Sequence, residues 1–181
     1  MCQSGIDLQS LETEIRNALE KLHSRWDKNY RAKWSEKKWT SEVKCAIYSV
    51  CKTKANSLLN YDHWFGFNGE KPAETEQTGG EWLFDFSWRL FRKREDNKNW
   101  LLIETPLVVE SEWYMDHESI SDDLTKVLTA CCGLGVFIHQ SAERVEYIDQ
   151  QIEELCNIGP KRMLVARWTS ERFIFTLIDR A

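Results

Sequence analysis

Apolar residues in the N-terminal third recur with the spacing of an α-helix. The steps between them are 3 or 4 residues, and the preceding Asp7 is placed to cap such a helix. The stripe consists of Leu8, Leu11, Ile15, Leu19, Leu22 and Trp26. A second stripe, with Trp39, Val43 and Val50, predicts another helix over residues 39–54. The periodicity is lost between residues 55 and 80, where we expect a long loop.

From residue 81 onward, short apolar segments predict strands, and two further 3.6-residue patterns predict helices. The expected helices cover residues 120–131, entered through Ser119 or Ser121, and 145–155, closed by Gly159 and Pro160. Pro106 lacks a backbone N–H and therefore marks a bulge or an edge within its strand. The expected strands cover residues 81–91, 100–113, 135–140, 162–168 and 172–179.

The predicted order of elements is ααββαβαββ, which is typical of an α/β fold with a central mixed sheet flanked by helices. A chain of 181 residues corresponds to one domain. Within residues 1–181 we expect a helical N-terminal segment (1–54), the loop (55–80), and a sheet core with two helices (81–181). An apolar fraction of 42% supports a packed core and excludes a disordered chain.

Composition also bears on location and on metal chemistry. The chain has no apolar run long enough to cross a membrane, and no secretory signal is visible in its first residues. Its six cysteines form no CxxC pair, and its four histidines show no metal-binding spacing. We therefore expect a cytoplasmic protein with reduced thiols, and we expect neither a zinc site nor a nucleophilic cysteine.

The formal net charge of −5 is unevenly distributed along the chain. Residues 1–60 contain 11 Lys and Arg against 7 Asp and Glu, whereas residues 61–120 contain 6 against 13. A basic group interleaved with aromatic residues is typical of a nucleic-acid contact, although a solvated face of a helical hairpin has the same composition. The candidate contact residues are Arg31, Lys33, Lys37 and Lys38. Among the nine tryptophans, Trp34 and Trp64 are the better candidates for an interface.

Three acidic residues occur in strongly apolar surroundings. Asp85 lies between Phe84 and Phe86, and Glu110 and Glu112 follow an apolar strand on one face. If the two strands form a hairpin, these carboxylates meet, and they then require a cation, a proton or a basic partner. Oxygen ligands favour Mg²⁺ or Mn²⁺, which could promote hydrolysis of a phosphodiester. The alternative is that both glutamates are hydrated where the strand ends.

This arrangement resembles the PD-(D/E)xK nuclease superfamily, whose restriction-endonuclease-like core has the order αβββαβ. The resemblance covers residues 36–140, and it implies a three-layer core and a nuclease that acts on nucleic acid, DNA rather than RNA, with a homodimer as a candidate assembly. It assigns Asp85 as the metal-binding Asp and Glu110 as the acid of the Glu-x-Lys element. It also gives Glu42 as an additional metal ligand, for which Glu36 is the competitor.

The sequence departs from the superfamily pattern at one functional position. Glu112 stands where most members have a Lys, and some members supply that Lys from the following helix. The candidate here is Lys126, but helical geometry predicts that it points away from the apolar stripe and pairs with Asp122. Gln140, at the end of a buried strand, could also reach the site. The alternatives are a catalytically inactive member of the same fold that binds nucleic acid or protein, or an unrelated α/β binding domain.

Overall fold

The computed structural model describes residues 5–28, 33–58, 60–69, 83–94, 99–114, 116–140, 145–154 and 159–179. Among these residues, no helix is both long and apolar enough to cross a membrane. None of the four cysteines that the structure describes, at positions 45, 51, 131 and 132, forms a disulfide.

Two long N-terminal helices form as the apolar stripes predict. In α1 (Leu8–Lys28), the Asp7 carboxylate accepts hydrogen bonds from the backbone N–H groups of Gln9 and Ser10, both at 3.0 Å. The helix α2 (Glu36–Ala55) begins one turn earlier than its stripe, because the Ser35 side chain caps it. The two stripes pack into one buried cluster.

Six strands form one mixed sheet in the order β1-β2-β3-β4-β5-β6. The three central strands β3, β4 and β5 are parallel, and the remaining pairs are antiparallel. The strands are β1 (Asp62–Phe67), β2 (Phe86–Lys93), β3 (Trp100–Glu112), β4 (Leu134–Gln140), β5 (Arg162–Trp168) and β6 (Phe173–Asp179). The hairpin of β5 and β6 was predicted from the sequence and is confirmed.

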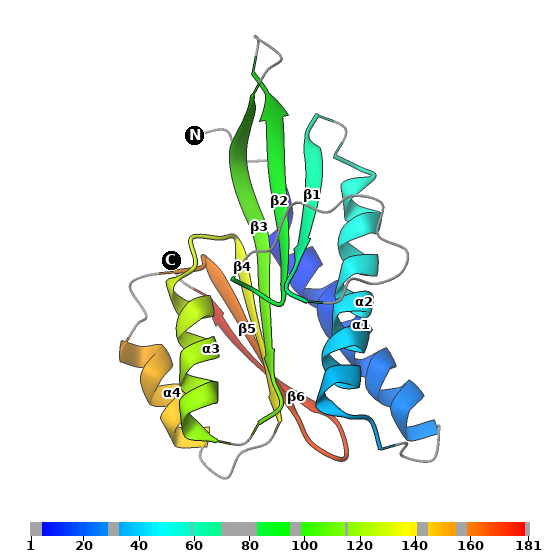
Figure 1. The fold of residues 1–181 in the computed structure, drawn as a ribbon, viewed down its shortest axis with the longest axis vertical. Helices are drawn as coiled ribbons and strands as arrows, with labels where there is room; N and C mark the ends of the chain where they lie inside the picture. The colour runs from blue at the N-terminus through cyan, green and yellow to red at the C-terminus, as the bar shows by residue number, and fades with distance from the viewer. Residues whose placement is uncertain are drawn as a thin grey trace.

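Helices cover both faces of the sheet, so the molecule is a mixed α/β structure, as expected (Figure 1). The helices α1 and α2 lie on one face, and α3 (His117–Thr129) and α4 (Val145–Glu154) lie on the other. Each pair of helices packs on the sheet through its own apolar cluster. The outer ends of β1, β2 and β3 extend beyond α3 and α4 (Figure 1).

Several sequence predictions need correction. Residues 55–80 contain the strand β1, so the observed order is ααβββαβαββ, with one more strand than predicted. The strand expected from residue 81 begins at Phe86, and α3 begins after the cap Asp116 and not at Ser119 or Ser121. Pro106 does mark a bulge, because Thr105 and Pro106 lie opposite the single residue Arg89 in the register of β2 and β3.

Candidate functional site

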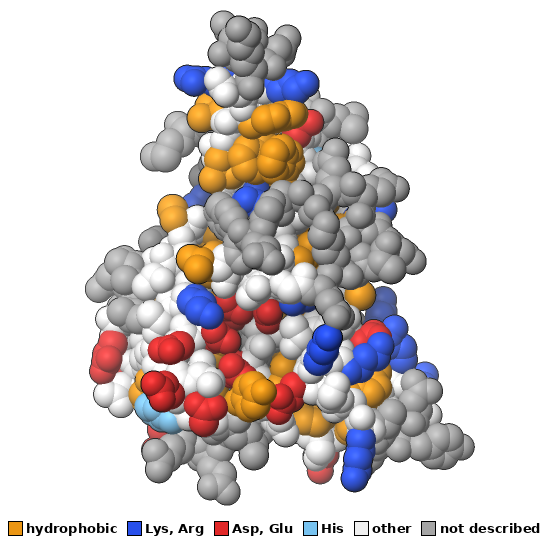
Figure 2. Space-filling view, viewed as in Figure 1, with side chains coloured by type: hydrophobic (Ala, Val, Ile, Leu, Met, Phe, Trp, Pro, Cys, Tyr) orange, Lys and Arg blue, Asp and Glu red, His pale blue; other side chains and the backbone are white. Residues whose placement is uncertain are grey.

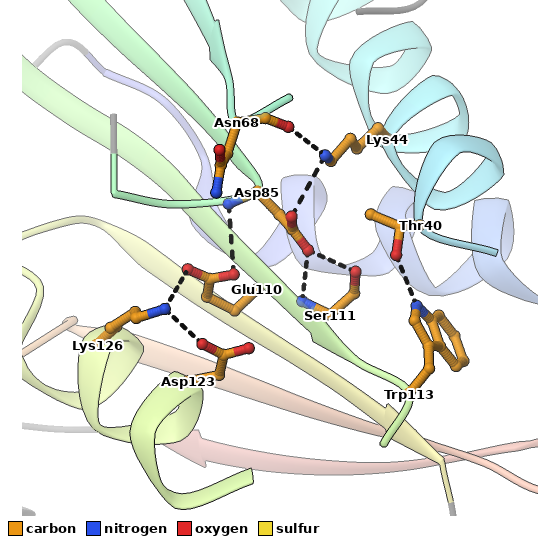
Figure 3. A network of polar contacts seen from close by, with 9 residues as sticks. All are labelled: Thr40, Lys44, Asn68, Asp85, Glu110, Ser111, Trp113, Asp123 and Lys126. Atoms are coloured by element: carbon orange, nitrogen blue, oxygen red, sulfur yellow. Dashed lines mark hydrogen bonds and ion pairs between the residues drawn. The ribbon is translucent and has the colours of Figure 1, made fainter. Parts of the chain in front are cut away.

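Asp85 and Glu110 lie next to each other where β2 begins and β3 ends. The register pairs Phe86 with Val109, which places Asp85 opposite Glu110. The backbone N–H of Asp85 lies 3.4 Å from the Glu110 carboxylate atom Oε2, to which it donates (Figure 3). The hairpin predicted from the sequence therefore makes these two residues neighbours, but the contact runs through the backbone N–H of Asp85 and not between the two carboxylates.

The carboxylate of Asp85 turns toward α2. Its Oδ2 accepts hydrogen bonds from the backbone N–H of Ser111 at 3.0 Å and from the Ser111 hydroxyl at 2.6 Å, and its Oδ1 lies 3.3 Å from the Lys44 ammonium (Figure 3). Lys44 is only 6% exposed and also donates to the carbonyl oxygen of Asn68 at 2.6 Å. Asp85 is thus held by one ammonium group and two hydrogen-bond donors from Ser111.

The carboxylate of Glu110 faces α3, away from the partners of Asp85. Its side chain lies in the buried sheet, and the residue is 4% exposed. Burial, followed by the charges of Asp85 and Asp123, raises the pKa of Glu110 to about 9, while Lys126 acts in the opposite direction. Burial thus disfavours the charged form of Glu110, and a nearby cation favours it.

Lys126 approaches Glu110 from α3. Its ammonium lies 3.8 Å from Glu110 Oε1 and 2.5 Å from Asp123 Oδ1 (Figure 3). The expectation that Lys126 points away and pairs with Asp122 is therefore wrong, because its long flexible chain reaches back over the sheet and it pairs with Asp123 instead. Glu110 and Asp123 together raise the pKa of Lys126 against the opposing effect of its partial burial.

Glu112 lies on the α3 side of the sheet, as the strand alternation predicts, but it has different partners from Glu110. Its Oε1 accepts a hydrogen bond from the backbone N–H of Tyr114 at 2.6 Å. Burial is the largest cause that raises the pKa of Glu112, and the nearby Asp123 contributes. Asp123 is thus close to Lys126, Glu110 and Glu112, and Figure 2 shows acidic side chains gathered around α3.

Glu42, the expected additional metal ligand, is engaged elsewhere. It forms ion pairs with Arg25 and with Lys38, at 2.6 Å for Lys38. Its competitor Glu36 approaches the exposed Tyr114, whose pKa it raises through a hydrogen bond and its negative charge. Among the described residues, no hydrogen bond joins Glu42 or Glu36 to Asp85 or Glu110.

The basic residues expected to contact nucleic acid are only partly described. Arg31 lies outside the described residues. Lys33, Lys37 and Lys38 are exposed on or just before the first turn of α2. Lys38 is paired with Glu42, and its ammonium lies 5.9 Å from the centre of a Trp34 ring.

Gln140, which the sequence also placed within reach of the site, ends β4 and is partly buried. In the described part of the chain, no hydrogen bond joins its side chain to Asp85 or Glu110. The structure therefore brings together Asp85, Glu110 and Lys126, with Glu112 nearby, and leaves Glu42 and Gln140 outside this group.

The carboxylate of Asp85 is directed toward α2 and that of Glu110 toward α3, so the two acids are neighbours whose carboxylates are bound by different partners. Within the part of the chain that is described, no three His, Cys, Asp or Glu residues are placed to hold a metal ion together. Mg²⁺, however, is often bound by one or two carboxylates, with water and substrate phosphate as its other ligands. Glu110 Oε1 is buried and has no hydrogen-bond partner among the described residues, and the Lys126 ammonium is 3.8 Å from it.

Three further residues of this site were not predicted from the sequence. Lys44 is the residue after Val43, which belongs to the apolar stripe of α2. Ser111 lies between Glu110 and Glu112, and Asp123 is three residues before Lys126. Only the spacing of Asp123 and Lys126 carried a signal, because residues three apart on a helix are neighbours. Comparisons of the chain with protein-family models, with curated proteins and with solved structures find no match.

Proposed function

We propose that the chain is a metal-dependent nuclease that hydrolyses phosphodiester bonds in nucleic acid. The observation that carries this proposal is the position of Lys126, whose ammonium lies 3.8 Å from Glu110. The PD-(D/E)xK pattern has a Lys at the position where this chain has Glu112. With Lys126 supplied from α3, the site has an Asp, a Glu and a Lys at the edge where β2 begins and β3 ends.

Each residue has a role that follows from its contacts. Lys126 is the group that would orient the attacking water and stabilise negative charge on the phosphate. Asp123 is a positioning residue, since its carboxylate holds the Lys126 ammonium at 2.5 Å. Ser111 and Lys44 fix the orientation of Asp85 from the other side.

Asp85 and Glu110 are the residues that would hold Mg²⁺ or Mn²⁺. When bound, such an ion supplies a water of lowered pKa and stabilises charge on the phosphodiester. Glu110 is 4% exposed, and the charged form of a buried carboxylate needs a positive partner, which a bound ion would supply beside Lys126. The Asp85 carboxylate would then contact both the Lys44 ammonium and the ion.

The proposal is tested by incubating the protein with plasmid, single-stranded DNA and RNA in the presence of Mg²⁺ or Mn²⁺. Cleavage is expected for the wild type, and Asp85→Asn and Lys126→Gln should each lower its rate by about 100-fold or more. Absence of metal-dependent cleavage on all three substrates would contradict the proposal. Thermal unfolding gives an independent measure: Mn²⁺ should raise the melting temperature of the wild type more than that of Asp85→Asn.

Two neighbouring acids of α3 provide a matched control. Asp123 contacts Lys126, whereas Asp122 is exposed. Asp123→Asn should reduce cleavage through loss of Lys126 positioning, and Asp122→Asn should leave it unchanged. A shift of the pH profile is expected in Asp123→Asn alone, because Asp123 raises the pKa of Lys126. Equal rates for the two variants would remove Asp123 from the mechanism.

A second candidate function is a catalytically inactive nuclease-like domain that binds nucleic acid or protein. The observation that favours it is the pairing of Asp85 with Lys44, which gives this carboxylate a cation of its own. This candidate predicts binding to nucleic acid or a protein partner that persists in Glu110→Gln. It also predicts no response of the melting temperature to Mg²⁺ or Mn²⁺.

A further inference from the structure

Aromatic rings form an open strip on the outer part of the sheet. The ring centres of Trp64 and Phe91 are 4.6 Å apart, and those of Trp64 and Trp100 are 5.7 Å apart. Trp100 is 38% exposed, and the neighbouring Leu102 is also exposed. Figure 2 shows this hydrophobic patch above the acidic region, over the strands that extend beyond α3. We call Trp64, Phe91 and Trp100 the aromatic strip.

The aromatic strip is not part of either apolar cluster. Phe91 pairs with Leu102 and Lys93 with Trp100, so these side chains share one face of β2 and β3. The opposite face, with Trp88 and Leu90, packs against α1 and α2. A solvated face of an antiparallel sheet is normally polar, so exposed rings at this place point to a ligand or partner.

Positive charge accompanies the rings. The Lys93 ammonium lies 5.1 Å from the centre of the Trp100 ring, and the Arg89 guanidinium lies 5.9 Å from that of Phe91. Arg92 pairs with Leu101 and lies on the opposite face of the hairpin, so Lys93 is the exposed strand cation on the face of the rings. On the face of the rings, the described strand ends carry the cations Arg89 and Lys93 and the acid Asp62. This balance is opposite to that of the acidic middle third as a whole.

We propose that the aromatic strip binds single-stranded nucleic acid. Unpaired bases would stack on Trp64 and Trp100 while Lys93 contacts a phosphate, which is how aromatic residues and cations are combined in single-strand binding. The exposed Arg94 adds positive charge at the end of the hairpin. A duplex hides the faces of its bases and is therefore a poorer fit. The binding itself needs no cleavage, but the identity of the bound strand as a substrate rests on the proposed function.

The position of the aromatic strip relative to the carboxylates supports this assignment. Trp64 pairs with Arg89, and Gly66 pairs with Ser87, on the face that also bears Phe91. Ser87 pairs with Val108, which belongs to the α3 side with Glu110. A strand bound at the aromatic strip would thus lie on the sheet face toward which Glu110 and Lys126 are directed.

Binding is measured by fluorescence anisotropy of a labelled 20-nucleotide single-stranded DNA or RNA, in EDTA and at low salt, where cleavage does not occur. Trp64→Ala and Trp100→Ala should each weaken binding by about 10-fold, because each removes a ring on which a base stacks. The matched control is Leu101→Ala, which removes an exposed apolar side chain next to Trp100 on the opposite face of the hairpin. It should bind as the wild type does.

Equal affinities of Trp64→Ala, Trp100→Ala and Leu101→Ala would overturn the proposal, as would a duplex competitor that displaces the single strand equally well. A change in self-association alone, measured by light scattering, would assign the aromatic strip to a second copy of the chain instead. Asp85→Asn separates this inference from the proposed function. If it binds normally and cleavage is absent even in the wild type, the nuclease proposal fails and the aromatic strip remains a binding surface.

Discussion

The two faces of β2 differ in the burial and the chemical type of their side chains. On the face toward α1 and α2, Phe86, Trp88 and Leu90 are fully buried and pack in the larger apolar cluster. On the other face, the strand carries the exposed Lys93 and the partly exposed Phe91 at its outer end. Toward its inner end, this face leads to the buried Glu110 of the adjacent β3.

The difference shows where the chain departs from what folding alone requires. The covered face places apolar residues inside, as hydrophobic burial favours. The other face has partly exposed aromatic rings at one end and a buried acid at the other, and both placements cost free energy unless a partner compensates. The residues that contradict their usual burial preference are therefore the best candidates for function.

The largest expected effect separates the two faces by stability. Trp88 is 0% exposed and donates a hydrogen bond from Nε1 to His63 Nδ1 at 3.2 Å, whereas Trp100 lies at the surface. Trp88→Ala should lower the free energy of unfolding by about 3–5 kcal/mol, and Trp100→Ala by less than about 1 kcal/mol. Urea denaturation followed by circular dichroism measures both. Similar losses in the two variants would mean that the aromatic strip is part of the core.

Much of the fold could be predicted from periodicity. The stripe of α1 and its Asp7 cap are confirmed, because apolar residues that recur three and four positions apart over five turns form one face of a helix and of no strand. The strand β1 was missed because it has aromatic residues at adjacent positions. Trp64 and Phe65 face opposite sides of the sheet. Without a polar residue at every second position, the two-residue period disappears.

Only the part of the site that depends on the pairing of β2 with β3 could be predicted from the sequence. The hairpin places Asp85 beside Glu110, and this was expected from the sequence. Lys126 was expected to point away because helical angles describe where a side chain starts and not how far a flexible Lys extends. Lys44 approaches Asp85 from a helix that is distant in the chain, and no local spacing encodes such a contact.

The second prediction concerns the pH dependence of stability. Glu110 has a pKa of about 9 in the folded protein, against about 4.3 for an unfolded chain, so the folded state binds a proton that the unfolded state has lost. This stabilising contribution is fully present below the unfolded pKa and is lost as the pH rises toward 9. Glu110→Gln should remove a slope of up to about 1.4 kcal/mol per pH unit between those values.

The control for this measurement is Glu153→Gln on α4, since Glu153 is exposed. Its unfolding free energy should follow that of the wild type at every pH between about 5 and 9. Urea midpoints taken across this range for the three proteins make the comparison. Parallel curves for Glu110→Gln and the wild type would show that the Glu110 carboxylate is already ionised in the folded state.

The smallest expected effect tests the outer end of the same face. Lys93 lies over Trp100, and if it contacts one phosphate of a bound single strand, Lys93→Gln should reduce the slope of log affinity against log salt by about 0.7. The affinity should fall for all sequences alike, because phosphate contacts carry no sequence information. Anisotropy titrations at several salt concentrations provide the slope. Lys21→Gln, on α1, is the matched control, since Lys21 is exposed on a helix that packs against the opposite face of the sheet. A slope that changes equally in both variants would reflect net charge alone, whereas a change confined to Lys93→Gln would locate a phosphate at the aromatic strip.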